Sequence, residues 1–297
     1  MWRHGSKGLL TLRKRPARVL HPKLRGNCVR MPTLRNSFRY CVATLFAASL
    51  AWPEAPAPGA VNYVEGRVSL DGKPLDSTPE SRAVQTGHVL QTENGRAEVL
   101  LTPGVFIRLG QNSALRMVSA TPSVTRVELL RGELLAEVIE LPNHGRLEVV
   151  DGEAYTQLVQ AGIYEFRADH RAILVYRGKA RIKDDARGLT LGAGQEIQPD
   201  PNSALHRSKF DRTETDGLYS WSAQRATDAA YCSEATAYNL LALDFGAKYD
   251  DGWYWNPWFQ SWAYVPSTGF RLSPFGYGLY APNRTQNRAP LFASFRQ

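Results

Sequence analysis

The sequence predicts a mainly β protein: a β-solenoid or sandwich-like all-β domain over residues 61–200, a helical connector over 201–248 and a small aromatic β-hairpin element over 249–297. Three observations predict this order. Short apolar runs separated by turn dipeptides fill the first range, an Ala-rich stretch without proline follows at 211–243, and aromatic residues crowd the last range. The 297 residues suffice for a sizeable core, and the 43% hydrophobic content excludes a disordered chain.

The first sixty residues have the layout of a secretory signal peptide. Residues 1–39 hold eleven Lys or Arg and no acidic residue, and residues 40–52 form an uncharged run. Small residues follow, with an A-x-A box at Ala55–Ala57. We predict a signal peptide over 31–60, cleaved near Ala57 or Ala60, and a basic upstream extension over 1–30. Met31 is an alternative start, which would make residues 1–30 a mis-started extension. The alternative is an uncleaved signal anchor, although thirteen residues fall short of the roughly 20 that span a bilayer.

Export changes the meaning of the charge and of the cysteines. The formal net charge is +8 and the pI about 9.5, but the residues from 61 onward carry 25 basic and 27 acidic side chains, a net of −2. We therefore expect a periplasmic or extracellular protein without a nucleic-acid partner and without a transmembrane helix in the mature chain. Cys28 and Cys41 would leave with the leader, so that Cys232 remains as a lone, buried thiol.

Residues 61–200 predict strands almost throughout. In 124–130 apolar and polar residues alternate, which indicates one buried and one wet face. A pattern of apolar strand, polar residue, glycine and second strand occurs three times, at Gly66, Gly132 and Gly178. The intervals of 66 and 46 residues are unequal, so two interpretations stay open: hairpins that reuse a favourable turn, or stacked turns of a β-solenoid.

The connector is predicted to be one helix or a helix pair. Four residues fall at helical spacing: Leu218, Trp221, Arg225 and Asp228. Thr213 or Thr215 is expected to cap the start, with Asp216 near the positive helix end, and Gly246 is expected to close the helix.

The C-terminal range holds fourteen aromatic residues among 49, most densely at 252–266, and Asn256-Pro257 predicts a turn between two short strands. Trp253 and Trp255 share one strand face, and Trp262 and Tyr264 share another. One interpretation uses the rings as the core of a small module. The other makes them a ligand-binding platform that stacks on glycan rings or on a partner, formed by these residues: Trp253, Trp255, Trp258, Trp262 and Tyr264.

Residues 87–117, GHVLQTENGRAEVLLTPGVFIRLGQNSALRM, resemble the FecR-type extracytoplasmic domain. Gly95-Arg96-Ala97 and Asn112-Ser113-Ala114-Leu115 occupy the places of that family's small turn and following strand, and 127–138 and 189–197 are also similar to it. The family's usual Gly-Thr before a late strand is Gly162-Ile163 here. The resemblance covers about residues 61–198. It implies a β-rich module that binds protein partners outside the cytoplasm.

FecR-family regulators sense an outer-membrane transporter and control a sigma factor through a cytoplasmic anti-sigma segment that precedes a transmembrane helix. The residues before 40 are not expected to fold into such a segment, so the resemblance carries over the module rather than the whole regulator. The segment WYWNPWFQSWAYVP (253–266) also resembles the Trp/Pro-rich part of secreted bacterial proteins of unknown function that often carry FecR-like domains.

No sequence pattern predicts catalysis, a metal site or a cofactor. His88, His144, His170 and His206 do not pair at metal-ligand spacing, and Asp184-Asp185 and Asp250-Asp251 lie near turn residues. Cys232 lacks a glycine-marked elbow. We therefore expect a non-enzymatic exported binding or scaffolding protein of the cell envelope with a protein or cell-wall partner. The alternatives are carbohydrate or peptidoglycan binding through the tryptophans, or envelope signalling.

Overall fold

The computed structural model describes residues 55–75, 83–121, 123–142, 144–152, 154–184, 187–198, 206–243 and 248–285. All of them belong to one compact unit, Ala51–Gln297. The predicted upstream extension, the signal peptide up to residue 54, Cys28, Cys41, Asp185 and the helix-closing Gly246 lie outside the described residues.

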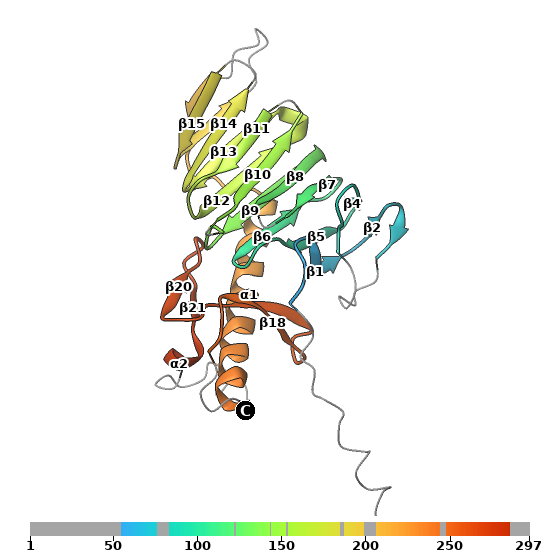
Figure 1. Cartoon of the computed structure of the whole chain (residues 1–297). Helices are drawn as coiled ribbons and strands as arrows, with labels where there is room; N and C mark the ends of the chain where they lie inside the picture. The colour runs from blue at the N-terminus through green and yellow to red at the C-terminus, as the bar shows by residue number, and fades with distance from the viewer. Residues whose placement is uncertain are drawn as a thin grey trace, which may run out of the picture. The chain divides into compact units, whose positions relative to one another are not determined.

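Two large sheets dominate the described chain, and neither closes into a barrel (Figure 1). Sheet A has eight strands in the order β1 (Ala60–Glu65), β5 (Arg96–Leu100), β6 (Val105–Leu109), β9 (Glu133–Val138), β12 (Gly162–Arg167), β13 (Ala172–Arg177), β16 (Gln195–Gln198) and β17 (His206–Lys209). Sheet B has nine strands in the order β15 (Arg187–Gly192), β14 (Lys179–Asp184), β11 (Ala154–Leu158), β10 (Arg146–Asp151), β8 (Val124–Arg131), β7 (Ala114–Ala120), β4 (Val89–Thr92), β2 (Val68–Leu70) and β3 (Lys73–Pro74). The 3₁₀ helix η1 (Ala168–His170) joins β12 to β13.

The strand order follows the chain order along sheet A and, apart from β2 and β3, along sheet B. The chain thus advances in one direction while it crosses repeatedly between the sheets. Most neighbouring strands are antiparallel, and β8 with β10 is a parallel pair. The predicted mainly β fold is confirmed, as a two-layer sandwich whose chain advances as the turns of a solenoid do.

The three repeated glycines mark crossings between the sheets. Gly66 leads from β1 to β2, Gly132 from β8 to β9 and Gly178 from β13 to β14, and each has a positive φ. The hairpin interpretation is therefore wrong at all three positions. The reason is close packing of one crossing on another: a Cβ on Gly178 would lie 2.8 Å from the Ala161 carbonyl oxygen, at the crossing into β12.

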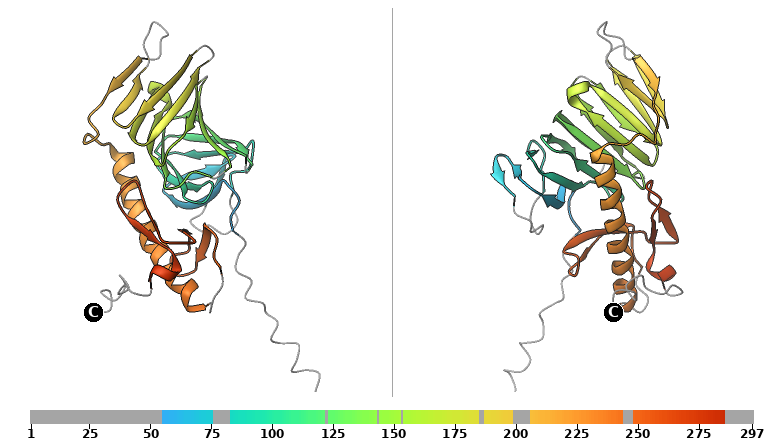
Figure 2. Two further views of the ribbon diagram at one scale, coloured as in Figure 1. Left: turned by 60° about the vertical axis from the view of Figure 1, so that its left-hand side comes forward. Right: turned by 180° about the vertical axis from the view of Figure 1, so that it is seen from behind.

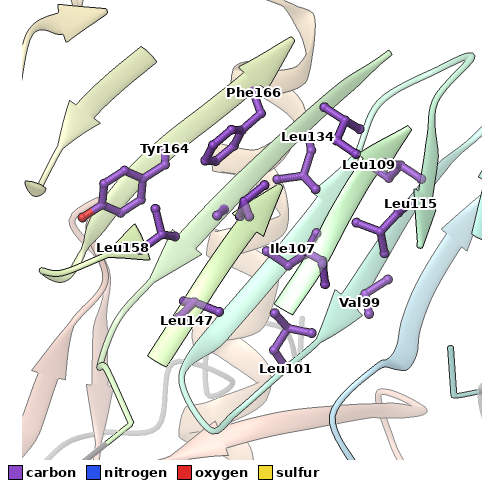
Figure 3. Packing of buried hydrophobic residues seen from close by; sticks show 14 of the residues in the cluster. Val99, Leu101, Ile107, Leu109, Leu115, Leu134, Leu147, Leu158, Tyr164 and Phe166 are labelled. Atoms are coloured by element: carbon purple, nitrogen blue, oxygen red, sulfur yellow. The ribbon is translucent and has the colours of Figure 1, made fainter. Parts of the chain in front are cut away.

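The main core lies between the two sheets, as Figure 3 shows for a part of it. Sheet A contributes residues such as Val99, Ile107 and Phe166, and sheet B contributes Leu115 and Leu147. These residues alternate along their strands with side chains of the opposite face, as the period of two in a strand requires. The two sheets therefore share one apolar interior, and each has an outer face with a separate environment.

One helix, α1 (Gly217–Leu243), and two hairpins cover the outer face of sheet A. The hairpins are β18 (Gly252–Asn256) with β19 (Ser261–Val265), and β20 (Phe270–Leu272) with β21 (Gly278–Tyr280). The short helix α2 (Pro282–Thr285) contacts α1. The view from behind in Figure 2 shows α1 on this side of the sandwich. No helix in the described ranges is long and apolar enough to span a bilayer.

The start of α1 differs from the prediction. The Asp216 carboxylate accepts a hydrogen bond from the Tyr219 amide at 2.7 Å, so Asp216 is the capping residue. Thr213 instead donates its amide and hydroxyl to Asp211 in the preceding turn. The predicted caps Thr213 and Thr215 are therefore wrong, because the helix begins one residue after Asp216.

Candidate functional site

The aromatic hairpin β18–β19 is mostly part of the core. Trp253 is 4% and Tyr264 1% exposed. The Trp253 ring packs edge-on to Phe106 of β6, and its indole nitrogen donates to the Leu101 carbonyl oxygen at 3.2 Å. The Tyr264 hydroxyl donates to the Glu140 carboxylate at 2.7 Å. These two residues of the predicted platform are therefore closed to any ligand.

The register of the hairpin determines which face of the two-stranded sheet carries each aromatic ring. Trp253 lies opposite Tyr264 and Trp255 lies opposite Trp262, so all four share one face of the two-stranded sheet rather than two separate faces. Trp255 and Trp262 are half-buried and meet edge to face with their centroids 5.4 Å apart. The face that sequence analysis offered to a ligand is thus turned largely toward the molecule itself.

Trp258 is the exception among the predicted site residues. It is 85% exposed and lies in the turn that joins β18 to β19. The buried Asn256 holds this turn, because its side-chain oxygen accepts from the Trp258 amide at 3.0 Å and its side-chain nitrogen donates to Thr236 of α1 at 2.9 Å. The turn that presents Trp258 is therefore attached to the long helix.

Charged side chains are buried where the helix covers sheet A. Arg108 is fully buried, donates to Glu98 at 2.9 Å and donates to Glu137 at 2.7 Å. Arg225 of α1 donates to the same Glu98 at 3.0 Å, and its guanidinium lies over the Tyr63 ring. Burial by itself would raise the pKa of Glu98, but Arg225 and Arg108 lower it to about 2. This ionic cluster joins the helix to the sheet.

A second buried carboxylate lies near the start of the helix. Glu165 of β12 is fully buried beside Arg167, which also donates to Asp216 at 2.9 Å. Burial, and then the negative charge of Asp216, raise the pKa of Glu165 to about 8. One arginine thus serves two carboxylates here, whereas Glu98 accepts hydrogen bonds from two arginines.

The outer face of sheet B carries charged side chains that are exposed to solvent. On β14, Ala180 and Ile182 point into the core, so Lys179, Arg181 and Lys183 point outward, and all three are exposed. None of them forms an ion pair with another described residue. In Figure 1 the strands of sheet B lie in front of sheet A, with no helix before them.

The strand next to β14 places uncharged side chains opposite two of these basic residues. Lys183 lies opposite Tyr155 of β11, which is 45% exposed, and Arg181 lies opposite Gln157. Further along the face, cations are already paired, as in the contact of Arg126 with Glu148. Three exposed cations without an ion pair to a described residue therefore lie in one row on β14, beside Tyr155. We call Lys179, Arg181, Lys183 and Tyr155 the β14 patch.

Sequence analysis missed both the buried cluster and the β14 patch. The available signal for the patch was the alternation K-A-R-I-K at 179–183, in which every outward position is basic. For the cluster, the strand VFIRL holds one charge among apolar residues, and the strand ELLAEV holds Glu137 between Ala136 and Val138. The covering helix begins more than 100 residues after Arg108, so no local pattern links the two.

The other side chains that could react or bind a metal have structural environments in the described residues. Cys232 is buried, and burial raises the pKa of its thiol to about 12. Within these ranges, no group of three or more His, Cys, Asp or Glu side chains could hold a metal ion. Asp251 accepts from the Ser267 amide and belongs to a turn.

Comparison with known proteins finds similarity in the β-rich part of the chain. The family model described as FecR protein matches residues 84–181, from just before β4 into β14. Among curated proteins, none matches the sequence. Two crystal structures of a candidate anti-sigma factor from Parabacteroides distasonis are similar in part. One is 18% identical, with a TM-score of 0.38, and covers 42% of this chain and 61% of its own. The other is 17% identical, with a TM-score of 0.39, and covers 45% and 63%.

The chain therefore spans less than two thirds of the length of either of those proteins. The family match falls inside the range 61–198 for which the sequence resembles FecR-type domains and leaves out the aromatic C-terminal range. Over residues 84–181 the sandwich is therefore similar to FecR domains.

Proposed function

We propose that this chain is an exported, non-enzymatic cell-envelope protein that acts in envelope signalling through its FecR domain. The observation that carries the proposal is the β14 patch, because it lies on the uncovered outer face of sheet B and has no counter-charge among the described residues. Lys179 and Arg181 are inside the matched FecR range. The partner that such a surface suits is a protein with exposed acidic side chains.

Export remains a proposal from the leader sequence, and the fold adds one detail to it. β1 begins at Ala60, and Gly59 donates its amide to the Leu100 carbonyl oxygen at 2.7 Å. Cleavage after Ala60 would remove both contributions to sheet A, whereas cleavage after Ala57 would keep them. Of the two predicted sites, the fold therefore favours Ala57.

Carbohydrate binding through the tryptophans is the weaker alternative. A glycan-stacking platform needs several open ring faces, and Trp253 and Tyr264 are closed by burial. The alternative now depends on Trp258, with Trp255 and Trp262 half-buried. The protein-binding proposal does not depend on these rings, because it rests on the exposed charge of the β14 patch.

Charge reversal tests the proposal. The variant K179E/R181E/K183E should lose capture of an envelope protein in cross-linking and affinity purification from envelope fractions. The matched control is R207E/K209E on the edge strand β17, where the side chains are also exposed but belong to sheet A. The control should capture the partner as the unmodified chain does, and capture should weaken with added salt. Equal capture by both variants would rule out the β14 patch as the binding surface.

A further inference from the structure

The turn between β18 and β19 is an apolar protrusion on a rigid support. All four of its residues, Pro257 to Gln260, are exposed, with Trp258 at 85% and Phe259 at 39%. The Asn256 hydrogen bonds described above fix the turn to α1. An exposed tryptophan on a fixed turn is costly in water, because its apolar surface stays hydrated while its conformation is already restricted.

The same turn lies beside the place where the chain enters the domain. The Asn62 side-chain oxygen of β1 accepts from the Trp262 amide at 2.9 Å and from the Ser261 hydroxyl at 3.2 Å. Ser261 and Asn256 form the last pair before the turn, so the base of the protrusion is bonded to the second residue after Ala60. Figure 1 shows β1 and this hairpin side by side.

The sequence before this point ends in an apolar run at residue 52, eight residues before β1 begins. Eight residues reach at most about 29 Å when fully extended. If the run lies in a bilayer, the start of β1 and the adjoining turn are held close to the membrane surface.

The hairpin that carries the turn and the segment that enters β1 contain no charged residue. Residues 252–264 contain no Asp, Glu, Lys or Arg, and neither do residues 55–63 on the entering strand. No ionic group in these two segments would have to lose its hydration at the lipid interface. Tryptophan is also the side chain that membrane proteins enrich at that depth, because its ring is apolar and its N–H is polar.

We propose that the Pro257–Gln260 turn is a lipid-contact element, which rests on the membrane surface with Trp258 in the interface. The proposal applies to the chain while its N-terminal apolar run is in the bilayer, both as the precursor and wherever the leader is kept. It is independent of the β14 patch, which lies on sheet B.

Fluorescence quenching by lipid tests the proposal on the full chain. The protein is reconstituted into phosphatidylcholine/phosphatidylglycerol vesicles in which the phosphatidylcholine is brominated in the upper part of its acyl chains. Trp52, the last residue of the apolar run, gives a background that all variants share. Trp258→Phe should remove a quenched component present in the unmodified protein, and Trp258→Ala should weaken vesicle binding by about tenfold or more.

The matched control moves the fluorophore to the other exposed hairpin. Phe270 is 59% exposed, and Figure 1 and the right-hand view of Figure 2 show β20–β21 on the opposite side of α1. The double variant W258F/F270W should show no quenching beyond that of W258F. Equal quenching of the unmodified protein and W258F overturns the proposal. Quenching at position 270 as strong as that at position 258 also overturns it, because it indicates adsorption without a preferred face. So does a change in Trp258 fluorescence that soluble peptidoglycan fragments cause and lipid does not.

Discussion

The two outer faces of the sandwich are built from the same kind of strand, yet they treat charge in opposite ways. On sheet A, Glu98, Arg108 and Glu137 are buried under the helix and hairpins, and Arg108 forms an ion pair with each of the two carboxylates. On sheet B, Lys179, Arg181 and Lys183 stand in solvent without acidic partners among the described residues. The comparison shows that the role of a charged residue in an alternating strand depends on a distant segment. Where such a segment covers the strand, the charge is buried in an ion pair, and where none does, the charge is free to bind a partner.

The largest expected effect is on the buried side of this comparison. Arg108→Met would leave Glu137 without its arginine and Glu98 with Arg225 alone. Because an uncompensated buried carboxylate is costly, the free energy of unfolding should fall by about 3–5 kcal/mol in chemical denaturation. The matched variant on sheet B is Arg116→Met, which breaks a half-exposed pair with Glu128 and should cost less than about 1 kcal/mol. Equal losses would contradict the difference between the faces.

The aromatic hairpin offers the same contrast within one element. Trp253→Ala should lower the free energy of unfolding by about 3 kcal/mol or more, because it empties a site packed against Phe106. Trp258→Ala should change it by less than about 0.5 kcal/mol, because the side chain is already in solvent. Thermal and chemical denaturation of the two variants measure this difference. A destabilising Trp258→Ala would show that this ring belongs to the fold.

An effect that depends on pH separates the two carboxylates beneath the helix. The pKa of Glu165 is raised to about 8, so the folded chain keeps a proton that the unfolded chain releases above its ordinary pKa near 4.5. Stability should therefore fall by about 1.4 kcal/mol per pH unit between about 4.5 and 8 from this group, and Glu165→Gln should remove that slope. Denaturation midpoints across this range test it, and an unchanged slope in the variant would contradict it.

Glu98 should act with the opposite sign. Its pKa is lowered to about 2, so the unfolded chain binds a proton that the folded chain refuses between about 2 and 4.5. The stability that Glu98 contributes is present above pH 4.5 and is lost as the pH falls toward 2. Glu98→Gln should flatten the acid limb of the stability profile and leave the limb between 4.5 and 8 unchanged.

The sequence predicts the two β-layers more readily than it predicts which segments cover their outer faces. The alternation at 124–130 and the spaced turn dipeptides indicate two-faced strands, and the order of strands, helix and aromatic hairpin follows from composition along the chain. The glycines at 66, 132 and 178 were visible, but a hairpin and a crossing between sheets use the same local conformation. The strand pairing distinguishes them, because each of these glycines joins a strand of one large sheet to a strand of the other.

The candidate site shows the same limit. Trp253 and Trp258 are alike in sequence, and their opposite environments depend on Phe106 and Asn256. Arg225 stood out at helical spacing, but its partner Glu98 lies 127 residues earlier. At the start of the helix, three capping residues fall within four positions, and the choice of Asp216 is made with the help of Arg167 from sheet A.

Amine labelling in intact envelopes tests the central claim most directly. A lysine-reactive reagent is applied to the chain in its envelope and to the purified protein, and each labelled lysine is quantified by mass spectrometry. The account predicts that Lys179 and Lys183 of the β14 patch react more slowly in the envelope, whereas Lys209, which is also exposed on β17, reacts at the same rate in both. Equal reactivity of all three lysines in both settings would contradict the claim that the open face of sheet B is the binding surface.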